Sequence, residues 1–555
     1  MNGPLLIISG PGTGKTRTLT HRIARLIGEH GVPPEQCLAI TFTNRAAREM
    51  AGRLEALQPA AATRVTVTTF HAFGYRILRE HFDRLSLPLG FRVAEGSDRV
   101  RVLTETLHVA ENKAETLIEK ISRHRRGAPR ESDQDDALPE MAAAYLRALH
   151  EGGWADFDDL ILLPLGLLES DAQLRTLYRR RYPWVSVDEF QDIDPQQYRL
   201  VRQLVPPDGN LCAIGDPDQS IYGFRGTDVR CFEQFTADFP AARVVPLTRN
   251  YRSSRSIVAA SLQVIAPATL VADRVLTALA GRDVLIEIRA SPTDKAEAEF
   301  VVHSIEKMIG GSTFFSMDSG RVDGAGGRHA FGDFAVLYRT AAQSDALREA
   351  FARSGMPFQT RSHLGLAATP VVRKLLALMG RESAAAPLPA SLQAAVQGLD
   401  DEGERREASG HLPTLAAMAA QASSLSDFQS LLTMGVDADL WDPGAERVSL
   451  LTLHASKGLE FPVVFIAGCE DGLLPLRWGS EPGDDAEERR LLFVGMTRAR
   501  ECLILSHARR RHWRGQVREM QPSPFLRDIE AALLDRTQSD HRRRQRPAAE
   551  QLSLF

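Results

Sequence analysis

The chain has 555 residues, a formal net charge of -4, and a composition that is 43% hydrophobic and 25% charged. The length predicts several domains rather than one core, and the composition is typical of a globular protein and excludes a disordered or fibrous one. No apolar run approaches the ~18 residues of a membrane span and no signal-peptide pattern is present, so we expect no membrane association and a cytoplasmic location.

The N-terminal segment predicts a strand, a glycine-rich loop and a helix. Leu5–Ile8 is apolar, Ser9–Thr16 has the sequence SGPGTGKT, and helical periodicity continues through Ile27. This is the order of a phosphate-binding βα unit. Further short apolar runs, separated by helical stretches, predict a parallel sheet. They are Cys37–Phe42, Val65–Thr69, Trp184–Val187, Leu211–Ile214 and Val244–Leu247.

A second group of apolar runs in the C-terminal half predicts another parallel sheet, and two similar sheets imply a cleft between them. These runs are Phe334–Tyr338, Val448–Thr452, Val463–Ala467 and Leu503–Ser506. Residues 86–170 and 381–445 have helical periodicity with few strand signals, so we expect two helical insertions, the second of them short. Residues 531–555 are polar and Arg-rich and predict a disordered tail.

The fold class that follows is α/β, with two domains whose parallel sheets are each interrupted by a mainly helical insertion. The first domain is expected at residues 1–85 and 171–247, and the second at 248–380 and 446–530. Five cysteines lack CxxC or metal-ligand spacing and predict no zinc site or disulfide framework. The net charge does not decide whether the partner is a nucleic acid, so the motifs must.

The SGPGTGKT segment predicts an ATP site. Glycines let backbone N–H groups face the phosphates, Lys15 reaches the β and γ phosphates, and Thr16 is a ligand for Mg²⁺. The predicted nucleotide-binding residues here are Ser9, Gly10, Pro11, Gly12, Thr13, Gly14, Lys15 and Thr16. Ser9 stands where the strict pattern has glycine.

The VDEFQD segment directly follows the apolar run Trp184–Val187, which puts two carboxylates at the carboxyl end of a strand. Ligands bind at that edge of a parallel sheet. Asp188 is predicted to hold Mg²⁺ and Glu189 to orient and deprotonate the attacking water. A solvated acidic turn would be the better interpretation if no phosphate loop were present.

The remaining motifs resemble, in order, those of the UvrD/Rep/PcrA group of superfamily 1 helicases. They are AITFTNRAAREM from Ala39, TFHAFGYRILR from Thr69, AIGDPDQSIYGFRGTD from Ala213, LTRNYRSS from Leu247, LTLHASKGLEFPVVF from Leu451 and EERRLLFVGMTRAR from Glu487. Together with the first two motifs they span most of residues 4–506. The resemblance implies two RecA-like domains and an ATP-driven motor on single-stranded DNA and DNA junctions, moving 3′ to 5′ in repair or replication.

The resemblance also implies residue roles. Gln219 would sense the γ phosphate, Arg252 and Arg498 would be arginine fingers, and Tyr251 with Arg17 would hold the adenine. Glu460 would lie near the ribose. Stacking on bases, which tolerates any sequence, would involve Phe42, His71, Tyr222, Phe224 and His454. An isolated aromatic residue is more often part of a core, and an isolated arginine more often belongs to a surface ion pair.

The sequence departs from the family in two places. Family members carry an adenine-reading glutamine upstream of the phosphate loop, but eight residues precede Ser9 here. Either this sequence omits that segment, or adenine selection is left to Arg17 and Tyr251. The second insertion is also much shorter than in the family, which leaves its contribution to duplex handling open.

Two alternatives to a DNA helicase remain at this point. One is a single-strand translocase that displaces bound proteins and separates duplex poorly. The other is a catalytically inactive recruitment module held by a DNA clamp. The last five residues, QLSLF, look like the short peptide that binds the bacterial sliding clamp, with Gln551 as the polar contact and Leu552, Leu554 and Phe555 as the apolar ones. A frayed terminus is the alternative interpretation of this peptide.

Overall fold

The structure is a computed structural model. It describes residues 2–85, 87–127, 137–223, 226–227, 229–279, 284–310, 329–360, 366–380, 387–435, 445–477, 484–513 and 515–538. The chain divides into two compact units. The first consists of Met1–Tyr251, Thr269–Leu276 and Arg361–Pro443, and the second of Arg252–Ala268, Thr277–Thr360 and Gly444–Phe555. No helix in the described part of the chain has the length and hydropathy to cross a membrane.

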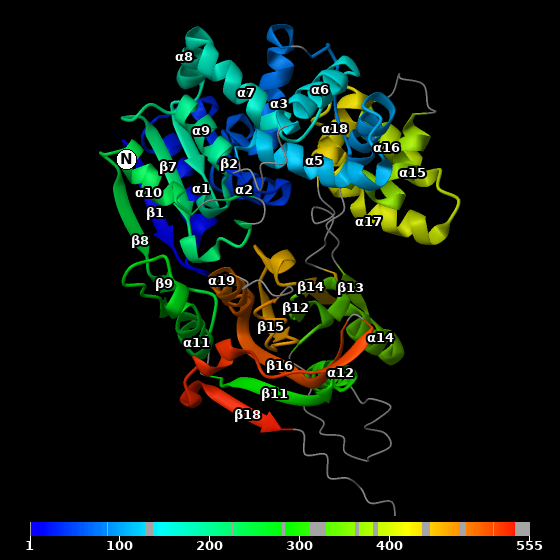
Figure 1. Cartoon of the computed structure of the whole chain (residues 1–555). Helices are drawn as coiled ribbons and strands as arrows, with labels where there is room; N and C mark the ends of the chain where they lie inside the picture. The colour runs from blue at the N-terminus through cyan, green and yellow to red at the C-terminus, as the bar shows by residue number, and fades with distance from the viewer. Residues whose placement is uncertain are drawn as a thin grey trace, which may run out of the picture. The chain divides into compact units, whose positions relative to one another are not determined.

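The first unit is built on a six-stranded sheet in which all described pairings are parallel (Figure 1). Its strand order is β3 (Thr66–Thr69), β2 (Cys37–Thr41), β6 (Trp184–Val187), β7 (Asn210–Gly215), β1 (Leu5–Ser9) and β8 (Arg243–Leu247). All six match predicted runs to within two residues. Because the strands are parallel, the loops after β1, β6 and β7 emerge at the same edge of the sheet.

Helices cover both faces of this sheet. On one face, α1 (Lys15–Gly28) and α2 (Asn44–Leu57) bury Leu19, Ile23 and Met50 against the strands. On the other, aromatic side chains such as Phe190 and Phe235 form the larger core. The helices on that face are α3 (Phe70–Glu80), α7 (Asp159–Ser170), α8 (Ala172–Arg181), α9 (Pro195–Leu204) and α10 (Cys231–Asp238). We expected α7 in the insertion, but its apolar side chains pack into this core.

The first insertion is a small helical subdomain with its own core. It contains β4 (Arg92–Val93), α4 (Gly96–Arg101), the π-helical turn Val102–Thr106, α5 (Glu111–Arg125), α6 (Leu138–Glu151) and β5 (Trp154–Ala155). Tyr145 and Leu103 are fully buried at its centre. The Tyr145 hydroxyl donates to Asp156, and Arg125 donates to both Asp156 and Asp159.

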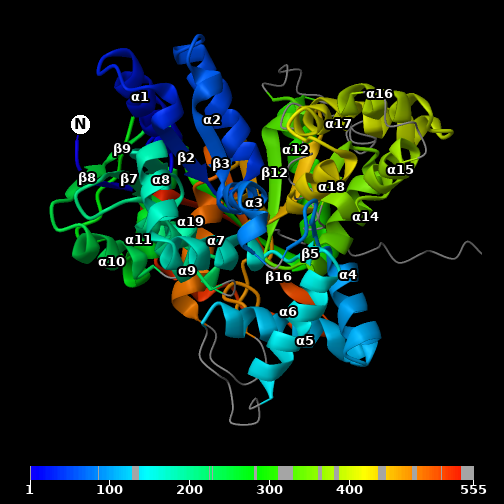
Figure 2. The same ribbon diagram turned by 90° about the horizontal axis from the view of Figure 1, so that it is seen from above.

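The second insertion is helical, as predicted, but it begins earlier than residue 381. Its helices are α15 (Pro370–Met379), α16 (Leu388–Gln397), α17 (Glu402–Ala419) and α18 (Leu425–Met434), and they share one core. The insertion belongs to the first unit, where α18 lies beside α3 (Figure 2) and also packs on β4. Asp427 of α18 accepts hydrogen bonds from Tyr75 and pairs with Arg79, both on α3.

The second unit contains an eight-stranded, mainly parallel sheet. Its order is β13 (Phe358–Thr360), β14 (Val448–Thr452), β12 (Phe334–Tyr338), β15 (Phe461–Ile466), β16 (Ala499–Trp513), β11 (Ile286–Thr293) and β18 (Leu534–Gln538), with β17 (Gln516–Glu519) antiparallel to β16. Its helices are α11 (Arg255–Ile265), α12 (Asp294–Ile309), α14 (Ser344–Ser354) and α19 (Asp485–Met496). The α/β fold class with two parallel sheets is therefore confirmed.

The C-terminal boundary of this unit differs from the prediction of a disordered tail from residue 531. Leu534 is buried, and Leu534–Gln538 pairs in parallel with β11 at the edge of the sheet. The sequence of this strand, LDRTQ, is mainly polar and has no apolar run, so it did not predict a strand. An edge strand needs little apolar surface.

Candidate ATP site and DNA-contacting residues

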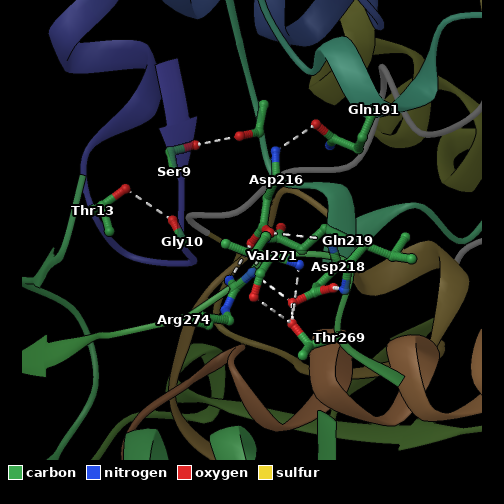
Figure 3. Close-up of polar contacts among 12 residues, drawn as sticks. Ser9, Gly10, Thr13, Gln191, Asp216, Asp218, Gln219, Thr269, Val271 and Arg274 are labelled. Carbon is green, nitrogen blue, oxygen red and sulfur yellow. Dashed lines mark hydrogen bonds and ion pairs between the residues drawn. The ribbon is translucent and has the colours of Figure 1, made fainter. Parts of the chain in front are cut away.

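The phosphate loop joins the end of β1 to the start of α1. Gly12 and Gly14 adopt left-handed backbone conformations, with φ of 67° and 82°, which glycine adopts without strain. Thr13 Oγ1 donates to the Gly10 carbonyl at 2.8 Å and fixes the turn (Figure 3). Ser9, which departs from the strict pattern, donates through Oγ to the Gly215 carbonyl at 3.0 Å and ties the loop to β7. The backbone N–H groups at the start of α1 are suited to bind phosphate.

Two oxygen donors suited to Mg²⁺ lie side by side at the same edge of the sheet. Thr16 Oγ1 is 3.2 Å from Asp188 Oδ2, the carboxylate that follows β6. Burial, together with the neighbouring Glu189, raises the pKa of Asp188 to about 7. A hydroxyl and a carboxylate are hard oxygen ligands of the kind that Mg²⁺ prefers. A cation at this position would relieve the cost of burying the charged carboxylate.

Glu189 is held in an unusual conformation beside the loop. Its φ is 51°, in the left-handed region that non-glycine residues seldom adopt. Gln191 Nε2 donates to Glu189 Oε2 at 2.5 Å, and Gln191 Oε1 accepts from the Asp216 backbone N–H at 2.9 Å. Lys15 Nζ lies 3.8 Å from Glu189 Oε2. The predicted base and the predicted phosphate-binding lysine therefore share one site.

Gln219 also reaches this site, from the loop that follows β7. Its Oε1 lies 3.4 Å from Lys15 Nζ, and its Nε2 donates to Asp216 Oδ2 at 2.6 Å. Asp216 and Asp218 are both fully buried, and both pair with Arg274. The structure thus brings together Lys15, Thr16, Asp188, Glu189 and Gln219, as the motifs predict.

The predicted adenine contacts lie next to the loop. The Tyr251 backbone N–H donates to the Gly12 carbonyl at 2.9 Å, while its side chain is 60% exposed and can offer a ring face. Asn250 Nδ2 donates to the Pro11 carbonyl at 2.7 Å, which holds this segment against the loop. Arg17 is exposed on the first turn of α1.

Four of the predicted DNA-contacting residues belong to described parts of the chain. In the first unit, Phe42 and Tyr222 stack on each other with ring centroids 5.6 Å apart and planes 16° apart. Phe42 and His71 line one cavity of about 120 Å³, and His71 makes an edge contact with Phe157. Burial lowers the pKa of His71 to about 4, so it is neutral at neutral pH. Phe224 lies outside the described residues, and His454 is half-buried in the second unit.

The two predicted arginine fingers belong to the second unit and contact protein groups there. Arg252 Nε pairs with Glu460 Oε2 at 2.5 Å. Burial of Glu460 opposes ionisation, but Arg252 and Arg500 outweigh it and hold the pKa of Glu460 below its ordinary value. Arg498 is buried and donates to the Val494 and Leu459 carbonyls. Glu460, predicted near the ribose, is thus an ion-pair partner of Arg252 in this structure.

A phosphate loop and two carboxylates at the carboxyl edge of a parallel sheet define a P-loop nucleoside triphosphatase. The family description "UvrD/REP helicase N-terminal domain" matches residues 1–240, and "UvrD-like helicase C-terminal domain" matches residues 245–382 and 393–510. The chain therefore belongs to the UvrD/Rep helicase family, which confirms the resemblance that the ordered motifs carry.

Two curated relatives illustrate the extent of the similarity. The chain is 30% identical to "ATP-dependent DNA helicase PcrA" of Staphylococcus aureus (strain Mu50) over 650 residues, which covers 99% of this chain and 87% of that protein. It is 32% identical to "ATP-dependent DNA helicase UvrD1" of Mycobacterium bovis over 660 residues, which covers 96% of this chain and 84% of that protein.

Sequence reasoning missed three residues that build the site. Gln191 lies within the motif VDEFQD, so its position next to Glu189 was a usable signal. Asp216 directly follows an apolar strand, as Asp188 does, so the same pattern predicts a carboxylate at this edge of the sheet. Arg274 lies in no recognised motif, and only the tertiary structure brings it to Asp216.

Proposed function

We propose that the chain is an ATP-dependent DNA helicase that moves 3′ to 5′ along single-stranded DNA. The observation that carries the proposal is the assembly of Lys15, Thr16, Asp188, Glu189 and Gln219 at one sheet edge. The relatives from Staphylococcus aureus and Mycobacterium bovis, both named ATP-dependent DNA helicases, support the choice of DNA as the polymer. The 3′ to 5′ direction rests on family resemblance alone.

In this proposal the chain's own residues prepare ATP for attack by water. The phosphate loop binds the phosphates through backbone N–H groups, and Lys15 neutralises the β and γ oxygens. Thr16 and Asp188 would hold Mg²⁺, which supplies charge neutralisation on the phosphates when bound. Glu189 accepts the proton of the attacking water, and Gln191 keeps the Glu189 carboxylate oriented.

Arg252 and Arg498 would stabilise the charge that develops on the γ phosphate. A guanidinium does this well because it stays ionised and donates in a fixed fork, and such arginines contribute about 10³ to 10⁵ in rate in related systems. Arg252 would exchange its bond to Glu460 for a bond to phosphate. Arg498 is already fixed by carbonyl acceptors, so little side-chain entropy is lost when it acts.

Aromatic side chains would bind the single-stranded DNA by stacking on its bases. Phe42, His71, Tyr222 and Phe224, with His454, offer ring faces that accept any base. Gln219 and Tyr222 are three positions apart on one loop, so a change at the γ phosphate would move the loop that contacts DNA. The stacked pair of Phe42 and Tyr222 would then open to admit a base between its rings.

Two measurements test the proposal. ATP hydrolysis with and without single-stranded DNA comes first, because a motor on DNA must be stimulated by its track. Displacement of streptavidin from biotinylated oligonucleotides then gives the direction. We expect displacement from the 5′ end, toward which a 3′ to 5′ motor travels. Displacement from the 3′ end alone would overturn the direction, and an absence of DNA stimulation would overturn the motor.

A second function, protein displacement with weak duplex unwinding, is favoured by one observation. Within the described residues, the second insertion contains four α-helices and is joined to α3 through Asp427. A tailed-duplex unwinding assay beside a streptavidin-displacement assay separates the two functions. Fast displacement with slow unwinding would identify a translocase.

We further propose that the C-terminal residues bind the bacterial sliding clamp. Gln551, Leu552, Leu554 and Phe555 lie outside the described residues, so this proposal rests on the sequence alone. A peptide of this size binds weakly, but attachment of both partners to one DNA raises the effective concentration. Deleting Gln551–Phe555 should abolish clamp capture and leave DNA-stimulated ATP hydrolysis unchanged. Undiminished capture by the truncated chain would overturn the proposal.

A further inference from the structure

A short segment far from any recognised motif contacts the ATP site of the first unit. This segment, Thr269–Leu276, is named the brace here; it belongs to the first unit, whereas the chain on either side of it belongs to the second. Arg274, whose side chain is 7% exposed, donates from Nη1 to Asp216 Oδ1 and from Nη2 to Asp216 Oδ2, both at 2.8 Å (Figure 3). Nη1 also reaches Asp218 Oδ2 at 2.7 Å.

The carboxylate that Arg274 holds also orients Gln219. Asp216 Oδ2 accepts a hydrogen bond from Gln219 Nε2 at 2.6 Å, so the carboxamide turns its oxygen toward Lys15 Nζ, 3.4 Å away. A carboxamide without this bond could also turn its N–H₂ group toward the nucleotide, because its two ends have nearly the same shape. The bond to Asp216 therefore fixes which end of Gln219 faces the nucleotide.

Charge makes Arg274 necessary for this arrangement. Burial opposes ionisation of Asp216, but Arg274 outweighs it and holds the pKa of Asp216 below its ordinary value. Asp218 is buried beside it, and a second carboxylate without a cation would favour protonation of one of the two. A protonated Asp216 would lose acceptor capacity for Gln219.

Two further contacts anchor the brace. Thr269 Oγ1 and the Leu270 backbone N–H both donate to Asp218, each at 2.6 Å. At the other end, Leu276 packs on the phosphate loop so closely that a Cβ added to Gly10 would lie 2.4 Å from Leu276 Cδ2. The brace thus spans from the loop of Gln219 to the loop that binds phosphate.

We propose that Arg274 is a positioning residue for ATP hydrolysis, which sets the orientation of Gln219 through Asp216. The inference rests on the proposed function, in which Gln219 contacts the γ phosphate. It acts on the chemical step rather than on nucleotide capture, because neither Arg274 nor Asp216 is part of the phosphate loop. Loss of orientation should therefore lower kcat and leave the KM for ATP nearly unchanged.

The test compares Arg274→Gln, Arg274→Lys and Gln219→Ala in DNA-stimulated ATP hydrolysis by the full chain. We expect Arg274→Gln to lower kcat about tenfold to a hundredfold with less than about a threefold change in KM. Arg274→Lys should give an intermediate kcat, since one ammonium retains the charge but cannot donate to both oxygens of Asp216 in parallel. In combination with Gln219→Ala, Arg274→Gln should add little, because both act through one carboxamide.

Arg125→Gln is the matched control. Arg125 has a similarly buried side chain, 8% exposed, and also bonds two carboxylates, but it lies in the first insertion. A purely structural role predicts that Arg274→Gln and Arg125→Gln lower the melting temperature alike and leave kcat per folded molecule unchanged; this would overturn the inference. A wild-type kcat for Arg274→Lys would also overturn it, even if Arg274→Gln does not fold. If Gln219→Ala hydrolyses ATP at the wild-type rate, the role of Gln219 in the proposed function is wrong, and the inference about Arg274 is wrong with it. If Gln219→Ala is impaired but the Arg274 variants are normal, only the inference about Arg274 is wrong.

A separate observation concerns the second unit, which has a cavity of about 760 Å³ away from its ATP-related motifs. It is lined by residues of β11, of β16 and of the chain after β17. Arg509, Arg510 and Arg527 line it, are exposed, and make no ion pair with any residue that the structure describes. His507 lines it too; this side chain is 8% exposed, and its buried Nδ1 has no hydrogen-bond partner in the described chain.

We infer that this cavity binds the phosphate backbone of nucleic acid outside the base-stacking track. Guanidinium forks pair with phosphate oxygens through two parallel hydrogen bonds, and the imidazole offers one more polar contact. Glu519 is the one acidic residue among the lining residues, so the cavity carries a net positive charge although the protein as a whole is acidic. No Phe, Tyr or Trp side chain lines it, and the ring of His507 is buried, so the contact is with the backbone and does not depend on sequence.

The test uses the double variant Arg509→Glu/Arg510→Glu and, from the chain after β17, Arg527→Glu. Binding of a tailed duplex is followed by fluorescence anisotropy over a range of salt concentrations. We expect affinity to fall about tenfold at low salt and the slope of log affinity against log salt to fall by about two for the double variant. Arg518→Glu, exposed on the same hairpin but not among the cavity residues, should change the slope by less. Unchanged DNA affinity in both cavity variants would overturn the inference. Cavity variants that lose binding to polyglutamate but keep binding to DNA would also overturn it, and would identify an acidic peptide as the ligand.

Discussion

Gln191 Nε2 donates a hydrogen bond of 2.5 Å to Glu189 Oε2. The same carboxamide accepts from the backbone of Asp216, so the predicted base is tied to the loop that carries Gln219. This bond fixes the orientation of the Glu189 carboxylate beside the phosphate loop.

Glu189→Gln should remove most ATP hydrolysis and leave ATP and DNA binding nearly intact. The amide keeps the shape and can still accept from Gln191, but it cannot take the proton of water, so kcat should fall about 10² to 10⁴-fold. Steady-state hydrolysis and titration with a fluorescent ATP analogue measure the two effects separately. Lys15→Ala serves as the contrasting variant, because it should weaken nucleotide binding itself. A wild-type rate for Glu189→Gln would show that another group is the base.

Tyr222→Ala should slow translocation more than ATP turnover. Tyr222 stacks on Phe42 in this structure, and stacking on a base is worth about 1 to 3 kcal/mol. Phe224→Ala should behave in the same way. Stopped-flow translocation and ATP hydrolysis on the same DNA give the ratio of steps to ATP. Tyr222→Phe keeps the ring and should keep that ratio. Equal losses in both rates would contradict coupling through this loop.

Asp427→Ala should loosen the second insertion from α3. Asp427 is buried and accepts from Tyr75, so its removal takes a charged acceptor away from a buried hydroxyl and should cost about 1 to 3 kcal/mol of folding stability. Denaturant unfolding and limited proteolysis within residues 361–443 measure the loss. Glu404→Gln is the control, since Glu404 forms an exposed ion pair with Lys374 in the same insertion. An exposed pair contributes about 0 to 1 kcal/mol, so comparable effects would contradict the prediction.

His71→Phe should change how stability depends on pH. Burial lowers the pKa of His71 from 6.5 to about 4. The folded state therefore disfavours the charged ring. The contribution of His71 to the free energy of unfolding is fully present above pH 6.5, and it is lost as the pH falls toward 4, because the ring is protonated first in the unfolded state. The wild type should lose stability relative to His71→Phe across that interval and hold a constant difference above it. Urea unfolding of both proteins at several pH values measures the difference, and a constant difference down to pH 4 would refute the assignment.

The sequence alone predicted the six strands of the first sheet, four of the eight strands of the second, and the segments that meet at the candidate ATP site. Strands such as β6 and β12 lie in the interior of a sheet covered on both faces, so their sequences are mainly apolar. The predicted ranges of both strands equal the observed ones. Asp188 and Glu189 directly follow β6, and Lys15 ends the loop that follows β1. Parallel strands place the loops that follow them at one edge of the sheet. Local sequence and topology together were enough to predict that these residues meet.

Tertiary structure decided the rest. β18 at the edge of the sheet has a polar sequence, and the docking of α18 on α3 depends on single polar side chains, so neither has a periodic signal in the sequence. Arg274 is 58 residues from Asp216 and lies in no motif, yet it supplies the cation that a buried carboxylate needs. Long-range pairing of this kind depends on how two segments pack. The sequence shows that residue 274 is an arginine, but only the packing of its segment against the loop after β7 decides which buried carboxylates it meets.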